Sequence, residues 1–264
     1  YGADTILSGA EPVYVPLKPP TFCFDADELE AAMKQDGVKA LILCNPSNPC
    51  GKVFTRDELL VIADLAKKYD LYVITDEVYE HILYKPHVHT YMAYLQGLRE
   101  RTIMCNSLSK TYGLAGARVG FCVGNKEVVS HLKTLKSNMD YGMFLPIQKA
   151  AIAAITGDQS CVASTRAAYE RRRDCLCDGL ASIGWKMEKP EGTMFVWAPI
   201  PAGFSDSMEF VKTLFEKTGV LVTPGSAFGP SGEGHVRMAL VQDEDAIALA
   251  VRRIAESGIL QSNQ

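Results

Sequence analysis

Short apolar runs alternate with helical patterns along the first half of the chain, and this alternation constrains the fold most. Strand-like runs lie at 40–44, 72–75, 102–105 and 119–123. One helical pattern opens with the capping sequence Asp25-x-x-Glu28 and is expected to stop at Gly37, and another opens with Thr55-x-x-Glu58. Strands that alternate with helices form crossover units, so we expect an α/β fold with a mostly parallel sheet.

The pattern changes in the second half. Residues 146–183 are almost entirely helical in character, with Gly184 as the expected end of the helical region. Strand-like runs then follow at 194–197, 220–223 and 235–240, interleaved with helical patterns near 206–218 and 244–257. We therefore expect two domains, residues 1–160 and residues 161–264, of which the second is a smaller α+β domain joined through a long helix.

Composition narrows the class of protein. With 264 residues, of which 47% are hydrophobic and 22% charged, the chain can bury a large core and is typical of a globular protein. The net charge of -4 and the lack of a dense Lys/Arg run argue against a nucleic-acid partner. No apolar stretch approaches the roughly 20 residues needed to span a bilayer. We therefore expect no membrane partner.

The cysteines and histidines give no sign of a metal site. The eight cysteines are scattered, Cys175 and Cys177 are the only pair close in sequence, and none has zinc-ligand spacing. This usage predicts reduced packing residues in a cytoplasmic protein. The five histidines form no ligand-spaced set either, so we predict no metal.

Two clusters of polar residues follow apolar runs. Asn45-Pro46 and Asn48-Pro49 come after the run at 40–44, and two prolines make this turn rigid enough to hold an amide in one place. Asp76 comes at the end of the run at 72–75, where open α/β sheets place ligand contacts. A plain strand-to-helix connection and a helix N-cap are the alternative interpretations.

The third cluster surrounds Lys110. This lysine lies between hydroxyl side chains and precedes Arg118 by eight residues, between the apolar runs at 102–105 and 119–123. Ser107 and Arg118 would suit a phosphate group, because hydroxyl donors and a forked guanidinium match its oxygens. A lysine beside a phosphate pocket suggests a Schiff base with a phosphorylated aldehyde. The alternative is a surface loop with a solvated lysine.

Together these clusters resemble the motifs of the class I/II aminotransferases, in the fold type I superfamily of pyridoxal-phosphate enzymes. The matching motifs are Asn-Pro-x-Asn-Pro-x-Gly at 45–51, Asp-x-x-Tyr at 76–79, Ser-x-Ser-Lys at 107–110 and a late arginine, Arg237. The resemblance spans essentially the whole chain. It implies a three-layer large domain with a mostly parallel sheet, truncated at its N-terminus, and a smaller C-terminal α+β domain.

The resemblance implies a cofactor, pyridoxal 5'-phosphate, and roles for four residues around its ring. Lys110 would form the Schiff base with the cofactor and later move a proton from the substrate. Asp76 would hold a proton on the ring nitrogen, because a facing carboxylate favours the charged form. Tyr79 and Asn48 would donate hydrogen bonds to the ring's 3-oxygen.

The resemblance also implies contacts to the cofactor phosphate and the substrate. Ser107, Arg118 and, with a weaker match, Ser109 would bind the phosphate, although backbone capping is an alternative role for Ser109. Arg237, together with Asn48, would bind the substrate carboxylate, since a guanidinium fork grips a carboxylate with two hydrogen bonds. The alternative for Arg237 is a surface ion pair.

The implied activity is transfer of an amino group between an amino acid and a 2-oxo acid. The run 138–150 is most similar to the alanine and LL-diaminopimelate aminotransferase branch. A carbon–sulfur β-lyase on the same scaffold and a non-catalytic interaction protein derived from the fold are the alternatives. The family pattern also implies a homodimer with shared sites.

The resemblance predicts that this chain is a fragment. It begins at Tyr1 rather than at a methionine, and family members carry a preceding segment. That segment supplies a glycine-containing phosphate loop, an aromatic ring stacked on the pyridine and a tyrosine that reaches a neighbouring subunit. A catalytically incompetent fragment is therefore a further alternative.

Overall fold

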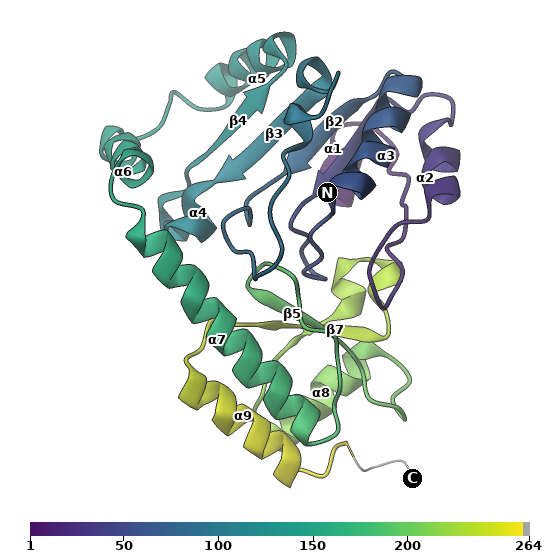
Figure 1. Cartoon of the computed structure of the whole chain (residues 1–264), viewed down its shortest axis with the longest axis vertical. Coiled ribbons are helices and arrows are strands. Elements are labelled where there is room, and N and C mark those ends of the chain that lie inside the picture. The colour runs from purple at the N-terminus through teal and green to yellow at the C-terminus, as the bar shows by residue number, and fades with distance from the viewer. Residues whose placement is uncertain (261–264) are drawn as a thin grey trace. The chain divides into compact units, whose positions relative to one another are not determined.

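The chain folds into two compact units. The computed structural model describes residues 1–260 (Figure 1). The first unit comprises Tyr1–Pro46, Val53–His81 and Val88–Val162. The second unit comprises Ser47–Lys52, Ile82–His87 and the C-terminal part of the chain from Ala163.

The first unit is built on a four-stranded sheet in the order β1-β2-β3-β4. These strands are β1 (Ala40–Cys44), β2 (Tyr72–Asp76), β3 (Thr102–Ser107) and β4 (Gly120–Gly124). The pairs β1–β2 and β2–β3 are parallel, whereas β3–β4 is antiparallel. The predicted α/β fold with a mostly parallel sheet is confirmed. The carboxyl ends of the three parallel strands lie at one edge of the sheet, and each of the three polar clusters begins there.

The helices α2 and α3 supply half of the buried residues in the first unit's core cluster. Asp25 caps α2 (Ala26–Met33), and Thr55 caps α3 (Arg56–Lys68) with a complete capping box to Glu58. Both helices therefore begin where the sequence predicts. The apolar face of α3 packs into a core of buried side chains that includes Leu29, Phe54, Leu59, Ile62, Ala66, Leu71, Val73 and Leu98.

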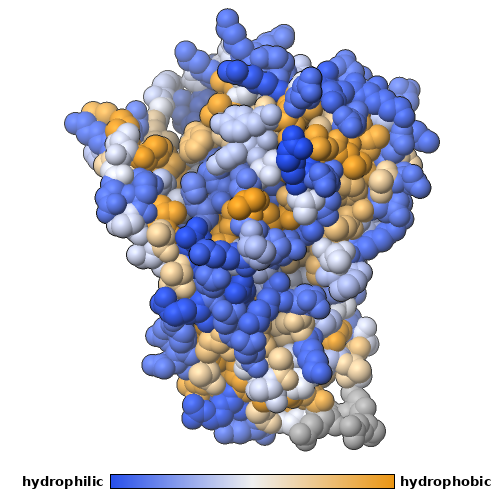
Figure 2. Space-filling model, in the orientation of Figure 1, coloured by the Kyte–Doolittle hydropathy of each residue, from blue (hydrophilic) through white to orange (hydrophobic). Residues whose placement is uncertain are grey.

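The first unit contains several further helices, of which the two longest, α5 and α6, are largely exposed. These further elements are α1 (Gly2–Leu7), α4 (Leu108–Thr111), α5 (Lys126–Met139), α6 (Leu145–Thr156) and the 3-10 turns η1 (Met92–Tyr94), η2 (Arg99–Arg101) and η3 (Ala115–Ala117). Neither α5 nor α6 has a buried residue. The apolar side chains of Leu145, Ile152 and Ile155 on α6 are exposed, and Figure 2 shows orange atoms over this helix.

The second unit contains a three-stranded antiparallel sheet in the order β5-β7-β6. Its elements are α7 (Ser160–Ser182, which begins within the first unit), β5 (Phe195–Pro199), α8 (Ser207–Thr218), β6 (Thr223–Pro224), η4 (Gly225–Phe228), η5 (Pro230–Gly232), β7 (His235–Ala239) and α9 (Glu244–Glu256). The helix α9 runs beside α7 (Figure 1), and a Cβ atom at Gly179 would lie 3.1 Å from Val251. The core includes Leu180, Trp185, Val196, Phe210, Leu214, Val236, Leu240 and Ile254.

The prediction of one strand in this unit is largely wrong. The run 220–223 was expected to be a strand, but β6 covers only Thr223–Pro224. Gly219 ends α8 with a left-handed backbone, the Val220 N–H bonds to the Thr218 hydroxyl, and Leu221 is exposed. Because residues 219 and 220 form the C-terminal cap of α8, the start of this apolar run does not pair with the sheet. Within residues 1–260 no helix combines the length and apolar character needed to cross a membrane.

Candidate active site

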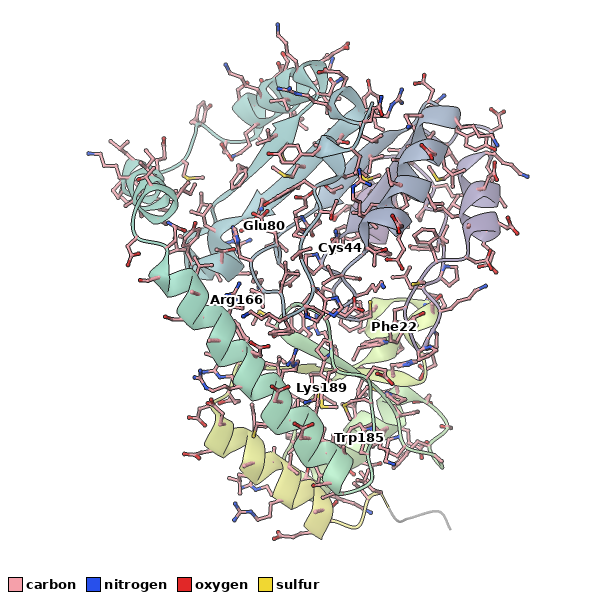
Figure 3. The ribbon with its side chains drawn as sticks, viewed as in Figure 1. Phe22, Cys44, Glu80, Arg166, Trp185 and Lys189 are labelled. Carbon is pink, nitrogen blue, oxygen red and sulfur yellow. The ribbon has the colours of Figure 1, made fainter. Side chains whose placement is uncertain are left out.

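The predicted residues of the first unit lie where its parallel strands end. Asp76 is the last residue of β2 and Ser107 the last residue of β3. The Asn45 N–H donates to the carbonyl of Asp76 over 3.0 Å, which ties the turn after β1 to the end of β2. Figure 3 labels Cys44, the last residue of β1, among the side chains of this region.

The Asp76 carboxylate accepts two hydrogen bonds. The Tyr1 hydroxyl donates to Oδ2 over 2.5 Å, and the Val78 N–H donates to Oδ1 over 3.2 Å. Burial, followed by the nearby Cys44 and Asp76 groups, raises the pKa of Tyr1 far above its ordinary value, so this hydroxyl acts as a donor. A carboxylate has about four acceptor sites, so Asp76 retains capacity for a further hydrogen-bond donor.

Tyr79 and its acidic neighbours occupy the turn after β2. Tyr79 is 4% exposed. Glu77 accepts from the Thr75 hydroxyl over 2.8 Å and pairs with His89 over 3.2 Å, and Glu80 accepts from the Asn106 amide. The ligand-type atoms of Glu77, Glu80 and His89 lie within 4.8 Å of one another. Sequence reasoning missed this cluster, because His89 lies twelve residues from Glu77 and the spacing gives no local signal.

Lys110 lies on α4, the single helical turn that follows β3. Ser107 caps this turn by accepting from the Ser109 N–H over 3.2 Å. Lys110 is half-buried, and its amine has no hydrogen-bond or ion-pair partner anywhere in residues 1–260. A half-buried ammonium group is stabilised by pairing, by water or by covalent use. The unpaired amine fits the predicted covalent role and does not require it.

The predicted phosphate ligands are only partly brought together. Ser107 and Ser109 lie in contact through their hydroxyl oxygens, 2.9 Å apart, and Ser107 also lies 3.0 Å from the carbonyl of Val119. Capping, which was the alternative role for Ser109, is performed by Ser107. Arg118 is exposed with a φ of 54° and donates to the carbonyl of Ala115 over 2.9 Å. Neither serine is a hydrogen-bond partner of Arg118 in the part of the chain that the structure describes.

The other two predicted residues, Asn48 and Arg237, belong to the second unit and are in contact. The Arg237 guanidinium donates to the Asn48 side-chain oxygen over 3.0 Å, although 189 positions separate them. Arg237 lies on β7, the central strand of its sheet, where its guanidinium carbon is 4.1 Å from the Phe195 ring centre and 4.6 Å from that of Phe228. Two aromatic faces and an amide therefore fix the direction of the guanidinium fork.

A mostly parallel sheet with an acid and a lysine near its strand ends, together with an α+β unit bearing a fixed arginine, is typical of the fold type I aminotransferase class. The sequence profile described as "Aminotransferase class I and II" matches residues 1–254. The chain belongs to this family, and the predicted resemblance is confirmed.

Individual relatives agree with this assignment. The chain is 41% identical to the glutamate-pyruvate aminotransferase AlaC of Escherichia coli K12 over 96% of its own length and 62% of the relative's. It is 36% identical to the LL-diaminopimelate aminotransferase of Gloeobacter violaceus, over 98% of this chain and 66% of that one. The chain thus spans somewhat less than two thirds of these curated relatives.

Solved structures share the fold. The aromatic aminotransferase from Pyrococcus horikoshii OT3 has a TM-score of 0.94 at 33% identity, covering 98% of this chain and 70% of that one. The aspartate aminotransferase from Thermus thermophilus with maleate has a TM-score of 0.92 at 30% identity, covering 97% of this chain and 66% of that one. The described units are therefore the corresponding parts of the aminotransferase fold.

Proposed function

We propose that this chain belongs to a pyridoxal 5'-phosphate-dependent aminotransferase that moves an amino group between an L-amino acid and a 2-oxo acid. The observation that carries the proposal is the unpaired, half-buried amine of Lys110 immediately after β3, with Asp76 at the end of the adjoining strand. The activity of its relatives in the family and their names support it. Residues 1–160 and 161–264 are the proposed large and small domains.

Bound pyridoxal 5'-phosphate supplies an electron sink for the bond that breaks at the substrate's α-carbon. Asp76 would accept a hydrogen bond from the ring nitrogen and so favour its protonated form. Tyr79 and Asn48 would each serve as a hydrogen-bond donor to the bound ring. Ser107, Ser109 and Arg118 would hold the phosphate group with hydroxyl and guanidinium donors.

Lys110 has two proposed tasks. Its amine would hold the cofactor covalently, and after substrate binding it would take the proton from the substrate's α-carbon as a general base. Both tasks need an amine that is not held in a permanent ion pair. The lack of a partner for Lys110 within residues 1–260 supports this assignment.

Arg237 and Asn48 are the proposed substrate-binding pair. A guanidinium fork between the Phe195 and Phe228 rings binds a carboxylate with two hydrogen bonds, which orients the bond to be broken. The pairing with Asn48 holds the fork in position before substrate arrives. We propose a homodimeric assembly and a cytoplasmic location, and alanine and 2-oxoglutarate as first substrates to test.

Covalent trapping tests the proposed role of Lys110. The purified chain is mixed with pyridoxal 5'-phosphate, reduced with borohydride and digested, and modified lysines are located by mass spectrometry. We expect the adduct at Lys110, its loss in Lys110→Ala, and weaker cofactor binding in Asp76→Asn. Lys133→Ala, an exposed lysine on α5, is the matched control and should leave the adduct unchanged. Equal labelling of several exposed lysines, with little at Lys110, would contradict the proposal.

Substrate assays test the reaction type. Alanine and 2-oxoglutarate should give pyruvate and glutamate, with the amino group conserved between the two products. Release of ammonia from cystathionine in place of transfer would indicate elimination and contradict the aminotransferase assignment.

A further inference from the structure

One row of side chains crosses the four-stranded sheet at the level of Asp76. Cys44, Asp76, Cys105 and Cys122 are successive register partners on β1, β2, β3 and β4. Register partners on neighbouring strands point to the same face of a sheet. Three cysteines therefore share a face with the carboxylate of the proposed cofactor site, although they are far apart in sequence.

Cys105 and Cys122 are already in contact. Their sulfur atoms lie 3.3 Å apart, both side chains are half-buried, and both cysteines are free thiols. Residues directly opposite in an antiparallel pair have Cα atoms about 4.5–5.5 Å apart, which falls within the range that disulfides span. The sulfurs would need to approach by about 1.3 Å to form a bond. Side-chain rotation can supply this movement without a change of strand register.

We propose that Cys105 and Cys122 form a peroxide-reactive dithiol in which Cys122 attacks and Cys105 resolves. The Cys122 thiolate attacks one oxygen of hydrogen peroxide, the O–O bond breaks, and hydroxide leaves and takes up a proton to form water. The Cys105 sulfur then attacks the resulting sulfenic acid and gives up its proton. The S–O bond breaks, a second water leaves, and a disulfide remains. Two thiols are oxidised and one peroxide is reduced, so atoms and electrons balance.

The surroundings of the two cysteines assign these roles. Cys105 lies on β3, between β2 and β4, whereas Cys122 lies on β4, the edge strand of the described sheet. Burial raises the pKa of Cys105 to about 12, and the hydrogen bond with Cys122 and the charges of Asp76 and Glu77 act in the same direction. A protonated Cys105 can donate its S–H toward the Cys122 sulfur, 3.3 Å away. Cys105 is then in place to attack over a short distance once Cys122 is oxidised.

This reaction needs two thiols and a peroxide, and it does not depend on the proposed aminotransferase activity. The two cysteines nonetheless lie close to the proposed cofactor ligands. Cys105 pairs with Asp76 across the sheet and precedes Ser107, the N-cap of the Lys110 turn, by two residues. Oxidation would therefore alter the same face that carries the proposed cofactor ligands.

Peptide mapping of the wild-type chain tests the bond itself. The reduced chain is treated with hydrogen peroxide, remaining thiols are alkylated, and the digest is analysed without reductant. We expect a linked peptide pair containing Cys105 and Cys122, lighter by about 2 Da than the sum of the two reduced peptides and separated by dithiothreitol. Cys161→Ser, which removes an exposed thiol, is the control and should form the same link. Oxidation of Cys161 without a link between Cys105 and Cys122 would overturn the proposal.

Trapping with dimedone, which labels sulfenic acids, tests the two roles. In Cys105→Ser the sulfenic acid on Cys122 cannot be resolved, so Cys122 should become labelled. In Cys122→Ser we expect at least about tenfold less label on Cys105, because that thiol stays protonated. Equal or greater labelling of Cys105 would show that the assigned order of attack is wrong.

Discussion

At the scale of single residues, Tyr84 shows how one side chain joins segments distant in sequence. It is fully buried, its hydroxyl donates to the carbonyl of Thr193 over 2.6 Å, and the Arg173 guanidinium lies 4.3 Å from its ring centre. Burial raises the pKa of Tyr84 above its ordinary value, which keeps the hydroxyl protonated as a donor. Tyr84 therefore binds the short segment Ile82–His87 to the C-terminal part of the second unit.

Removing this hydroxyl should destabilise the protein. Tyr84→Phe leaves a buried carbonyl at Thr193 without this donor, which should lower the free energy of unfolding by about 1–3 kcal/mol. Urea denaturation monitored by circular dichroism measures the change. Tyr72→Phe removes an exposed hydroxyl and is the matched control, with a change within about 0.5 kcal/mol. Equal effects of the two substitutions would contradict the role given to the Tyr84 hydrogen bond.

A second prediction at this scale concerns Arg237. Arg237→Lys keeps the charge but loses the fork and its stacking between two rings, so the KM for the amino acid should rise by about tenfold or more. The kcat should fall less, because the change removes mainly substrate binding. Steady-state kinetics of the assembled enzyme measure both constants. Arg252→Lys on the exposed side of α9 is the control, and a matching rise in KM there would count against Arg237 as the carboxylate ligand.

At the scale of elements, local capping sets where the helices begin. The Thr55 side chain accepts from the Glu58 N–H, and the Glu58 carboxylate accepts from the Thr55 N–H over 2.7 Å. These bonds satisfy groups that the first turn of α3 leaves without partners inside the helix. The same local chemistry made the starts of α2 and α3 predictable. The strand expected at 220–223 was mispredicted because the C-terminal cap of α8, at Gly219 and Val220, was not recognised in the apolar run.

Removing the α3 cap should have a measurable effect. Thr55→Ala should lower the free energy of unfolding by about 1 kcal/mol, since an N-cap hydrogen bond is lost. Chemical denaturation gives this value. Thr134→Ala, within the exposed helix α5, loses only a hydroxyl bond to the Ser130 carbonyl and serves as the control. A loss at Thr134 as large as that at Thr55 would show that the effect is not due to capping.

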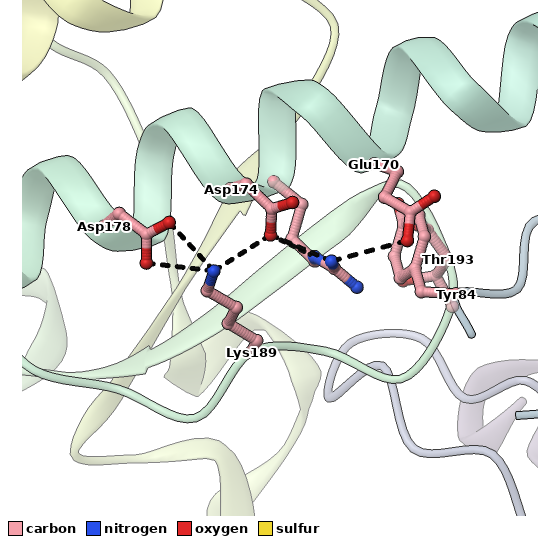
Figure 4. A network of polar contacts seen from close by, with 7 residues as sticks. Tyr84, Glu170, Asp174, Asp178, Lys189 and Thr193 are labelled. Atoms are coloured by element: carbon pink, nitrogen blue, oxygen red, sulfur yellow. Dashed lines mark hydrogen bonds and ion pairs between the residues drawn. The ribbon is translucent and has the colours of Figure 1, made fainter. Parts of the chain in front are cut away.

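At the scale of the whole molecule, a polar network on α7 makes stability depend on pH. Lys189 bonds to Asp174 and Asp178 over 2.9 Å each, and Arg173 bonds to Asp174 (Figure 4). Burial alone would raise the pKa of Asp174, but the hydrogen bonds from Lys189 and Arg173 outweigh it and leave this pKa below its ordinary value. For Lys189, burial acts to lower the pKa, and the two aspartates outweigh it and raise that pKa.

These two shifts define a pH window for the network's contribution. A lowered carboxyl pKa contributes stability above the unfolded value of about 3.9, and this is lost as pH falls through the folded pKa. The raised lysine pKa contributes below about 10.4 and is lost as pH rises through its folded value.

Lys189→Met should therefore lower the free energy of unfolding by about 0.5–1 kcal/mol at pH 7 and by less near pH 3. The effect is small because Lys189 and Asp174 are both partly exposed and screened by solvent. Urea unfolding at both pH values measures these changes in the free energy of unfolding. Lys186→Met, at an exposed lysine, is the control. An effect of Lys189→Met that does not change with pH would contradict the role given to the network.

The second unit is made of segments that are distant in the sequence, and this gives a further prediction. Two segments from the first half of the chain complete it: the Gly51 carbonyl accepts from the N–H groups of Glu191 and Gly192, and the Ile82 carbonyl accepts from that of Thr193. Residues 163–264 expressed alone lose these partners and the Tyr84 side chain, so we expect a broad, low-temperature transition by calorimetry. The intact chain is the control. A sharp transition of the fragment at the intact chain's temperature would show that the two segments are dispensable.

The sequence by itself determined the class of fold, most helix and strand positions and the residues proposed for the site. It could do so because these signals are local: apolar runs, capping boxes and polar clusters directly after strands such as β2. Tertiary structure alone decided which of these residues meet. The contacts of Asn48 with Arg237, Cys105 with Cys122 and Tyr84 with Thr193 join residues from 17 to 189 positions apart. Such contacts depend on strand order, register and the return of distant segments, which no local pattern encodes.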